Sequence, residues 1–181
     1  HKDDYIKAHV KRLQNAEQDT LSQGERKEYR TLRSNRVVYA DGGIKPDVRV
    51  ESDTTQVSDY MVKVIAQGVY NEFVLDYLDK YRAQLEVNYP TFEKFDSGFE
   101  LTDEDMLSFV ELSKTKGVDF DEAGFEQSHK LIKIQISAII AQRLYSVSEY
   151  YRYINPRIND SFKKSLWLLN NWESEAKPLL E

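Results

Sequence analysis

Residues 131–144 read LIKIQISAIIAQRL, and this stretch decides the fold class of the chain. Its apolar residues fall on most faces of a helix, which is typical of a helix surrounded by other helices. Together with its flanks, the stretch predicts one long helix from about Asp121 to about Val147. We expect this helix to form the centre of a helical core.

Upstream of this stretch, a second helical pattern runs from Met61 to Tyr81, where apolar residues recur at steps of three and four. It predicts an amphipathic helix that follows an N-cap at Ser58 and ends near Leu85. Gly68 lies inside the pattern, where glycine costs about 1 kcal/mol relative to alanine. We expect a neighbouring helix to use the missing side chain for close approach.

A further helix is predicted between these two patterns. Thr102 is the expected N-cap, because three carboxylates follow it in the first turn, where the helix dipole favours negative charge. Gly117 suits the position just past the C-terminus of this helix. Residues 91–100 are predicted to be irregular, with their phenylalanines packed on the core. These are Phe92, Phe95 and Phe99.

The C-terminal part of the chain continues the helical pattern. The Asn-Pro pair at 155–156 suits a helix start, and Asp160 is predicted to cap a helix over residues 161–171. Residues 172–181 are expected to form a last turn or to fray. The tyrosines of residues 145–153 have two interpretations: the aromatic edge of the core, which we favour, or a binding surface.

Ahead of the helices, residues 36–50 read RVVYADGGIKPDVRV and give the one convincing β signal in the chain. Two β-branched runs, Arg36–Tyr39 and Val48–Val50, flank a turn signal at Gly42 and Gly43. Glycine adopts positive φ without a Cβ clash, which suits a tight turn. The pattern therefore predicts a strand, a tight reversal and a second extended segment.

The residues before this segment are mixed and polar. A short amphipathic helix is predicted over residues 3–18 and a strand over 28–32. An isolated two-stranded hairpin is marginal in water, and its edges invite pairing. Within this chain the strands must therefore pair with residues 28–32, with a second copy of the chain, or not at all.

Residues 36–47 also carry a motif: Arg-x-Val-Tyr, a glycine cluster, then Gly-Ile-x-Pro-Asp. It resembles the end of the catalytic domain in carboxyl-terminal processing peptidases, which are tail-specific serine proteases with a Ser/Lys dyad. In the Bacteroidetes-type branch of that family a long helical tail follows, and the resemblance extends loosely over residues 28–145. The residues that carry the motif are Arg36, Tyr39, Gly42, Gly43, Ile44, Pro46 and Asp47.

The chain departs from the family pattern in two places. Asn35 stands where the family usually has glycine, and asparagine is the non-glycine residue most tolerant of left-handed φ. Ala40 and Asp41 replace part of the glycine run, which leaves the turn less freedom.

The resemblance implies that residues 1–50 are the C-terminal end of a peptidase core and that residues 51–181 are a helical tail domain. In the family the serine and lysine of the dyad lie upstream of this motif, so no catalytic residue is expected in this chain. The implied partners are the peptidase core of the same protein and, through it, protein or peptide substrates. The implied location is the bacterial envelope, in the periplasm, and a homo-oligomer is left open.

Composition excludes several classes of function. The net charge of −6 repels phosphate backbones, so nucleic acid is not an expected partner. The absence of cysteine excludes disulfides and thiolate chemistry. No run reaches the roughly 18 apolar residues of a membrane span. The chain begins with His1 and has no apolar leader, which predicts a piece of a longer polypeptide.

One local pattern suggests a metal site. Asp119-x-Asp121-x-x-Gly124 begins like a calcium loop, but Lys130 stands where a bidentate glutamate belongs. We therefore favour helix capping by Asp119 or Asp121 over calcium binding. No metal and no cofactor is expected.

The histidines offer no clear catalytic arrangement either. Ser128 and His129 are adjacent in sequence, so their side chains point to different parts of a helix surface and do not readily form a nucleophile-base pair. Neither His129 nor His9 has a partner at metal-ligand spacing. We favour a packing or surface role for both.

Taken together, the sequence predicts a mainly α fold: a multi-helix C-terminal bundle preceded by a small β-hairpin segment. The expected function is that of a non-catalytic portion of a serine-type carboxyl-terminal processing endopeptidase, with an architectural or substrate-access role. The alternative is a stand-alone helical module for protein-protein interaction.

Overall fold

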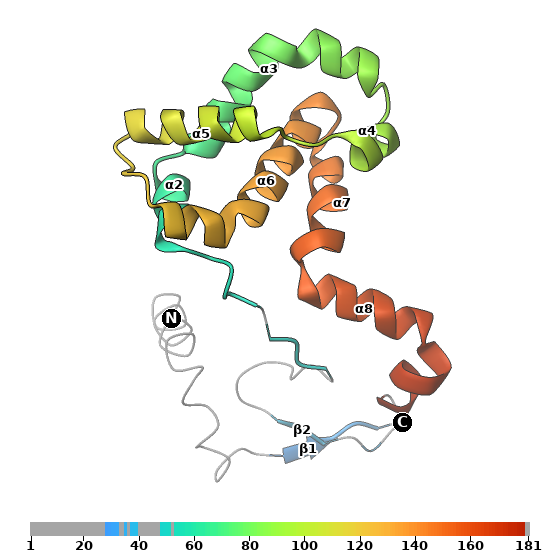
Figure 1. Cartoon of the computed structure of the whole chain (residues 1–181). Coiled ribbons are helices and arrows are strands. Elements are labelled where there is room, and N and C mark those ends of the chain that lie inside the picture. The colour runs from blue at the N-terminus through green and yellow to red at the C-terminus, as the bar shows by residue number, and fades with distance from the viewer. Residues whose placement is uncertain (1–27, 33–34, 36, 40–47, 52, 180–181) are drawn as a thin grey trace, which may run out of the picture. The chain divides into compact units, whose positions relative to one another are not determined.

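A computed structural model describes residues 28–32, 35, 37–39, 48–51 and 53–179 of the chain (Figure 1). The fold is mainly helical, with a small antiparallel hairpin ahead of the helices, as the sequence predicts. It divides into two compact units, residues 1–49 with 171–181, and residues 50–170. The helix predicted over residues 3–18 lies outside the described residues.

The hairpin pairs β1 (Glu28–Arg30) with β2 (Val37–Tyr39) in antiparallel register. The strand predicted near residues 28–32 is therefore confirmed, and it is the partner of β2. Val48–Val50, predicted as the second extended segment of the hairpin, lies in no strand. That part of the prediction is wrong, because β2 pairs with the segment that precedes it.

Asn35 lies in the connection between β1 and β2. Asn35 has a φ of +53°, in the left-handed region that asparagine tolerates. Its N–H donates to the carbonyl of Thr31 (3.1 Å), and its carbonyl accepts from Nη1 of Arg30 (3.0 Å). The tolerance expected of Asn35 is thus used in the connection between the two strands.

Two helices occupy the stretch that was predicted as one. They are α2 (Asp59–Ala66) and α3 (Val69–Asn88), with Gly68 between them at a φ of +67°. A Cβ built on Gly68 would meet no heavy atom within 4 Å, so the predicted close approach of a neighbouring helix is wrong. The glycine is needed because the backbone adopts left-handed geometry there.

Replacing Gly68 with alanine is therefore expected to cost about 1 kcal/mol of unfolding free energy, the penalty of a left-handed backbone with a Cβ. Gly68→Asn should cost less, since asparagine adopts this geometry more readily. Urea denaturation followed by circular dichroism measures both values. A neutral Gly68→Ala variant would contradict the backbone explanation.

Residues 91–100 are not irregular as predicted but contain a short helix, α4 (Phe92–Gly98). Thr91 caps it, because its side chain accepts from the N–H of Lys94 (3.5 Å). The helix has only about two turns, too few for a hydrophobic period to be recognised in the sequence. The burial of the phenylalanines is confirmed: Phe92, Phe95 and Phe99 all belong to the core.

The next two helices follow the sequence closely. Thr102 and Asp105 form a capping box at the start of α5 (Asp103–Thr115), and Gly117 follows its end with a φ of +78°. Asp121 caps α6 (Glu122–Leu144) by accepting from the N–H of Gly124 (3.1 Å). Capping by Asp121 is therefore confirmed.

The Asn-Pro pair lies inside α7 (Val147–Ile158) and does not start a new helix. Pro156 has no N–H for the carbonyl of Arg152, and the helix ends within its next turn. Asn159, rather than the predicted Asp160, caps α8 (Asp160–Asn170), because its Oδ1 accepts from the N–H of Phe162 (3.0 Å). The last turns are η1 (Trp172–Ala176) and η2 (Lys177–Leu179).

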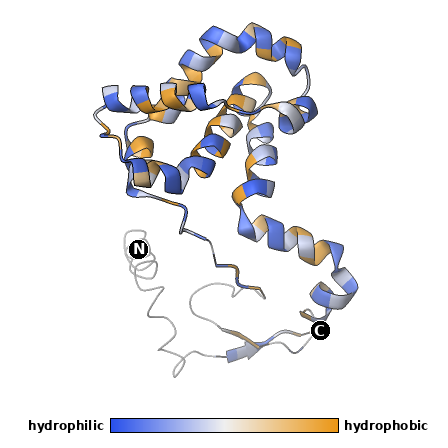
Figure 2. Cartoon of the chain, viewed as in Figure 1, coloured by the Kyte–Doolittle hydropathy of each residue, from blue (hydrophilic) through white to orange (hydrophobic). Residues whose placement is uncertain are grey.

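We refer to residues 50–170 as the helical unit. Its core is centred on α6, which packs against α2, α3 and α7. Ile132, Ile136 and Ile140 are fully buried, so the central position predicted for this helix is confirmed. Figure 2 shows apolar and polar residues interspersed along the helices, as expected of amphipathic helices around a shared core.

The tyrosines of residues 145–153 form an aromatic edge of this core, which confirms the favoured interpretation. Tyr153 is buried, and Tyr145 and Tyr150 are partly buried against the core cluster. The hydroxyl of Tyr145 donates to the carbonyl of Tyr89 (2.6 Å). Tyr151 is the exception, with 55% of its surface exposed.

Arg157 joins α7 to α4. Its Nη1 donates to Oδ1 of Asp96 (2.8 Å) and its Nη2 to the carbonyl of the same residue (3.1 Å). The guanidinium also lies 3.7 Å from the ring centroid of Tyr153. The chain thus holds this arginine between an aromatic ring and a carboxylate.

The polar linker before α2 is bonded to α6. Nε2 of Gln127 donates to the carbonyl of Thr55 (2.7 Å). Oγ of Ser128 accepts from the N–H of Ser58 (2.9 Å) and lies 2.8 Å from the carbonyl of Gln56, to which it donates. The linker is therefore fixed along α6 before the chain enters α2.

Two core tyrosines differ in their hydrogen bonding. The hydroxyl of Tyr60 lies 2.8 Å from Oγ of Ser113, which donates to the carbonyl of Val110. The hydroxyl of Tyr70 is buried and has no hydrogen-bond partner among the described residues. An unpartnered buried hydroxyl costs free energy, so the two hydroxyls contribute to stability with opposite sign.

Removing each hydroxyl should separate these contributions. Tyr70→Phe is expected to leave the unfolding free energy unchanged or to raise it by up to about 1 kcal/mol, because no bond is lost. Tyr60→Phe is expected to lower it by about 0.5–1.5 kcal/mol. Chemical denaturation of both variants gives the comparison. Equal losses would mean that Tyr70 has a bonding partner in solution.

Candidate functional site

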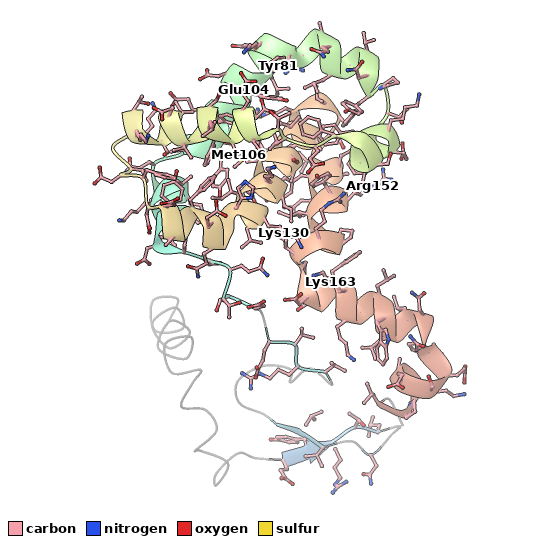
Figure 3. The ribbon with its side chains drawn as sticks, viewed as in Figure 1. Tyr81, Glu104, Met106, Lys130, Arg152 and Lys163 are labelled. Carbon is pink, nitrogen blue, oxygen red and sulfur yellow. The ribbon has the colours of Figure 1, made fainter. Side chains whose placement is uncertain are left out.

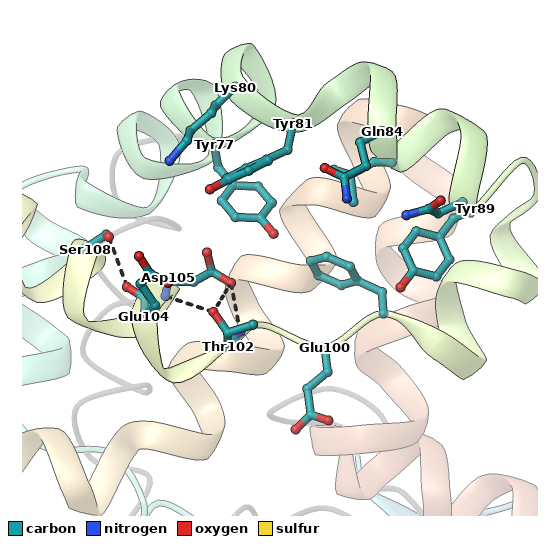
Figure 4. Close-up of a pocket in the computed structure, with 13 residues that line it drawn as sticks. Tyr77, Lys80, Tyr81, Gln84, Tyr89, Glu100, Thr102, Glu104, Asp105 and Ser108 are labelled. Atoms are coloured by element: carbon teal, nitrogen blue, oxygen red, sulfur yellow. Dashed lines mark hydrogen bonds between the residues drawn. The ribbon is translucent and has the colours of Figure 1, made fainter.

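A groove of about 310 Å³ lies between α3 on one side and the start of α5 with the segment that precedes it on the other (Figure 4). Figure 3 places Tyr81 and Glu104 on these two helices. The lining residues are Tyr77, Lys80, Tyr81, Gln84, Leu85, Asn88, Tyr89, Phe99, Glu100, Thr102, Glu104, Asp105 and Ser108.

One wall of the groove comes from a single face of α3. Tyr77, Tyr81, Gln84 and Asn88 are separated by steps of four, three and four residues, so they align along the helix. The rings of Tyr77 and Tyr81 lie 4.8 Å apart between centroids. The wall is therefore aromatic at one end and amide-bearing at the other.

Two further aromatic rings line the groove where α3 ends and where the segment after α4 begins, those of Tyr89 and Phe99. Phe99 is buried, and its ring meets that of Tyr77 edge to face at 6.4 Å and that of Tyr89 at 5.9 Å. The hydroxyl of Tyr89 donates to the carbonyl of Gly98 (3.0 Å), which holds this ring in place. Packing and backbone bonding fix these rings before any ligand arrives.

The opposite wall is the first turn of α5. Oδ2 of Asp105 accepts from both the N–H and the hydroxyl of Thr102, each at 2.8 Å, so the capping box fixes this carboxylate. Figure 4 shows the carboxylate pointing toward Tyr77 and Tyr81, whereas Glu100 points away from the other side chains. Asp105 is thus the carboxylate directed into the groove.

The local field of the groove favours positive charge. Burial raises the pKa of the Tyr77 hydroxyl, and the nearby Asp105 carboxylate raises it further, so this hydroxyl stays neutral. The pKa of Lys80 is raised by its hydrogen bond to Tyr81 and then by the carboxylates of Glu104 and Asp105. The Lys80 ammonium lies 4.8 Å from the centroid of the Tyr81 ring.

This arrangement can bind a ligand. Aromatic faces, amides and a fixed carboxylate recognise a cation through stacking and hydrogen bonds. Within the described part of the chain, no group of three or more histidine, aspartate or glutamate side chains could hold a metal ion.

Ser128 and His129 have separate roles. Ser128 is fully buried, and its hydroxyl bonds to Gln56 and Ser58. The His129 ring packs against that of Phe125, with 5.2 Å between centroids. The packing or surface role predicted for His129 agrees with this contact and with its half-buried side chain, whereas His9 lies outside the described residues.

The residues of the predicted peptidase motif and those of the groove are different sets. Tyr39 lies at the end of β2. The other motif residues lie outside the described part of the chain: Arg36, Gly42, Gly43, Ile44, Pro46 and Asp47. The sequence did not point to the groove, although the aligned spacing of Tyr77, Tyr81 and Gln84 is a signal for a polar aromatic face.

Comparisons with known proteins find a family similarity within the helical unit. Among the described residues, no helix has the length and apolar character needed to cross a membrane. No curated protein and no solved structure matches the chain. Residues 60–146 match a family described as "Family of unknown function (DUF8443)", and this match spans α2 to α6, including both walls of the groove.

Proposed function

We propose that this chain is the C-terminal, non-catalytic part of a serine-type carboxyl-terminal processing endopeptidase of the bacterial envelope. The helical unit would have an architectural or substrate-access role, and the peptidase core of the same protein would be its partner. The motif at residues 36–47 supplies the resemblance on which the proposal rests.

The observation that carries the proposal is the small size of the two-stranded hairpin among the described residues. Its strands have three residues each, and Val37 and Val38 are 39% and 42% exposed. A two-stranded sheet of this size is marginal in water, and its outer edges can pair with further strands. These features suit a segment whose sheet is completed by the peptidase core.

The helical unit has what a separate tail domain needs, its own hydrophobic core. It has a contiguous core with fully buried side chains on several helices, including Val64, Phe95, Phe109 and Ile136. A segment with its own core can be appended to an enzyme as a separate domain. This is what the proposal requires of the tail.

The experiment extends the protein upstream. The parent protein is expected to cleave a denatured protein substrate, and the cleavage should be lost when the upstream serine or lysine of the dyad is replaced. The 181-residue chain alone, at equal concentration, should cleave nothing. A parent reading frame without such a dyad, or cleavage by the short chain that depends on one of its own serines, would overturn the proposal.

The second candidate, a stand-alone module for protein-protein interaction, is favoured by α8. Phe162, Leu166 and Leu169 lie at steps of four and three residues on this helix and are 39%, 48% and 64% exposed. Exposed apolar faces of this kind mark contact surfaces. A parent protein that lacks the dyad would favour this candidate.

A further inference from the structure

The groove of the helical unit presents the same pair of groups with which this chain holds two of its own arginines, Arg152 and Arg157. Arg157 lies on the ring of Tyr153 and bonds to Asp96. Arg152 lies 4.6 Å from the ring centroid of Phe92 and bonds to Glu93 (3.1 Å). In both cases a guanidinium has an aromatic face on one side and a carboxylate within hydrogen-bond distance.

The groove repeats this arrangement without an arginine among its lining residues. Tyr77 and Tyr81 supply the rings, and Asp105 supplies the carboxylate. One oxygen of Asp105 accepts both bonds from Thr102, which leaves the other oxygen available to a ligand. Aromatic faces attract cations, and a charged hydrogen bond adds to that attraction.

The amide groups of the groove complete a set of acceptors for a planar donor. Figure 4 shows the Gln84 amide directed toward the space between Tyr77 and Tyr89. A guanidinium has five N–H donors in one plane and stacks on aromatic rings, whereas an ammonium is a more strongly hydrated point charge. The flat rings with acceptors around them therefore fit arginine better than lysine.

The size and charge of the groove limit what it can accept. A volume of about 310 Å³ is at the lower end of the range for ligand pockets, so it suits a side chain with its adjoining backbone. The Lys80 ammonium lies 4.8 Å from the Tyr81 ring centroid, which shows that a cation is stable at this ring. The hydrogen bond to Tyr81 is the main cause that raises the pKa of Lys80, and the carboxylates of Glu104 and Asp105 add to it.

We propose that the groove between α3 and α5 binds the arginine side chain of a peptide segment, stacked on Tyr77 and Tyr81 and bonded to Asp105. The inference concerns the helical unit alone and holds whether or not a peptidase core precedes it. It assigns to this unit a role as a recognition site for basic peptides.

The test is a titration of the 181-residue, ¹⁵N-labelled chain with an acetylated and amidated pentapeptide, Gly-Ala-Arg-Ala-Gly. We expect saturable shifts of the side-chain amides of Gln84 and Asn88, which report on the groove directly. The matched probe carries citrulline in place of arginine, which keeps the shape and removes the charge. Its affinity should be lower by at least about tenfold, the effect of one lost charge-assisted contact.

Two variants locate the site. Asp105→Asn keeps an oxygen that can accept from Thr102 but removes the charge, so the fold should persist while the affinity for the arginine peptide falls at least about fivefold. Tyr81→Leu removes the ring and should weaken binding similarly. Tyr151→Leu, on the exposed side of α7, is the control and should leave binding unchanged. Thermal unfolding of each variant verifies that it is folded.

Three outcomes would overturn the proposal. The first is the absence of saturable shifts at Gln84 and Asn88, and the second is equal binding of the citrulline peptide. The third is that free guanidinium ion binds as tightly as the pentapeptide, since the groove would then be a site for a small cation and not for the arginine side chain of a peptide. None of these results depends on proteolysis, so they leave the proposed peptidase role untouched.

Discussion

Replacing Phe95 with alanine is expected to lower the unfolding free energy by about 3–5 kcal/mol, the usual cost of removing a buried phenylalanine ring. Phe95 is fully buried on α4. Its ring is stacked on that of Phe99, with 4.4 Å between centroids. Three tyrosine rings also have centroids within about 6 Å of it: Tyr89 just before α4, Tyr145 at the end of α6, and Tyr153 on α7.

Urea denaturation measures this loss, and the melting temperature should fall by about 10 °C or more. Tyr151→Ala is the matched control, because that ring belongs to the neighbouring helix but is 55% exposed, and its removal should change stability by less than about 0.5 kcal/mol. A loss at Phe95 no larger than that of the control would mean that α4 does not pack on α7 in solution.

Ser128→Ala is expected to cost about 2–3 kcal/mol, in the upper part of the range for a buried polar group left without its partner. The hydroxyl of Ser128 accepts from the N–H of Ser58 and donates to the carbonyl of Gln56. Ser128 is fully buried and Ser58 nearly so, which makes it difficult for water to replace the lost bonds.

The control for this variant is Ser165→Ala. The hydroxyl of Ser165 bonds only to the carbonyl of Ser161 on its own helix and is exposed, so alanine should be neutral or slightly stabilising there. Hydrogen exchange of the Ser58 amide provides a second measurement, because this amide should lose protection in Ser128→Ala. Unchanged protection would contradict the role assigned to the hydroxyl.

The parts of the fold that could be predicted from sequence depend on neighbours within a few residues. Ser58, Thr102 and Asp121 are N-caps because a short polar side chain three residues before a backbone N–H can reach it, whatever the rest of the chain does. The position of α6 was also predictable, since an apolar surface on most faces requires burial on most faces.

The errors arose where a local pattern has more than one structural solution. Hydrophobic spacing continues across Gly68, so periodicity alone joins α2 to α3 although the backbone breaks there. Pro156 fits the first turn of a helix, but it also fits a last turn in which one bond is lost. In both cases the spacing of apolar residues does not report the backbone conformation that separates the two solutions.

The groove could not be predicted because its walls are separated along the chain. Tyr77 and Tyr81 lie on α3, and Asp105 lies beyond α4, a helix that the sequence did not reveal. The turn made by α4 brings the first turn of α5 opposite the tyrosines of α3. Because α4 was not predicted, the proximity of α3 and α5 could not be predicted either.

The bonds that fix the linker along α6 determine where a shortened version of the helical unit can begin. A polypeptide that started at Asp59 would contain every residue of α2, yet it would leave Gln127 and Ser128 without the carbonyls of Thr55 and Gln56. It would also lack the serine that caps α2. For crystallisation or binding assays, a fragment of the helical unit should therefore start no later than Thr55, several residues ahead of its first helix.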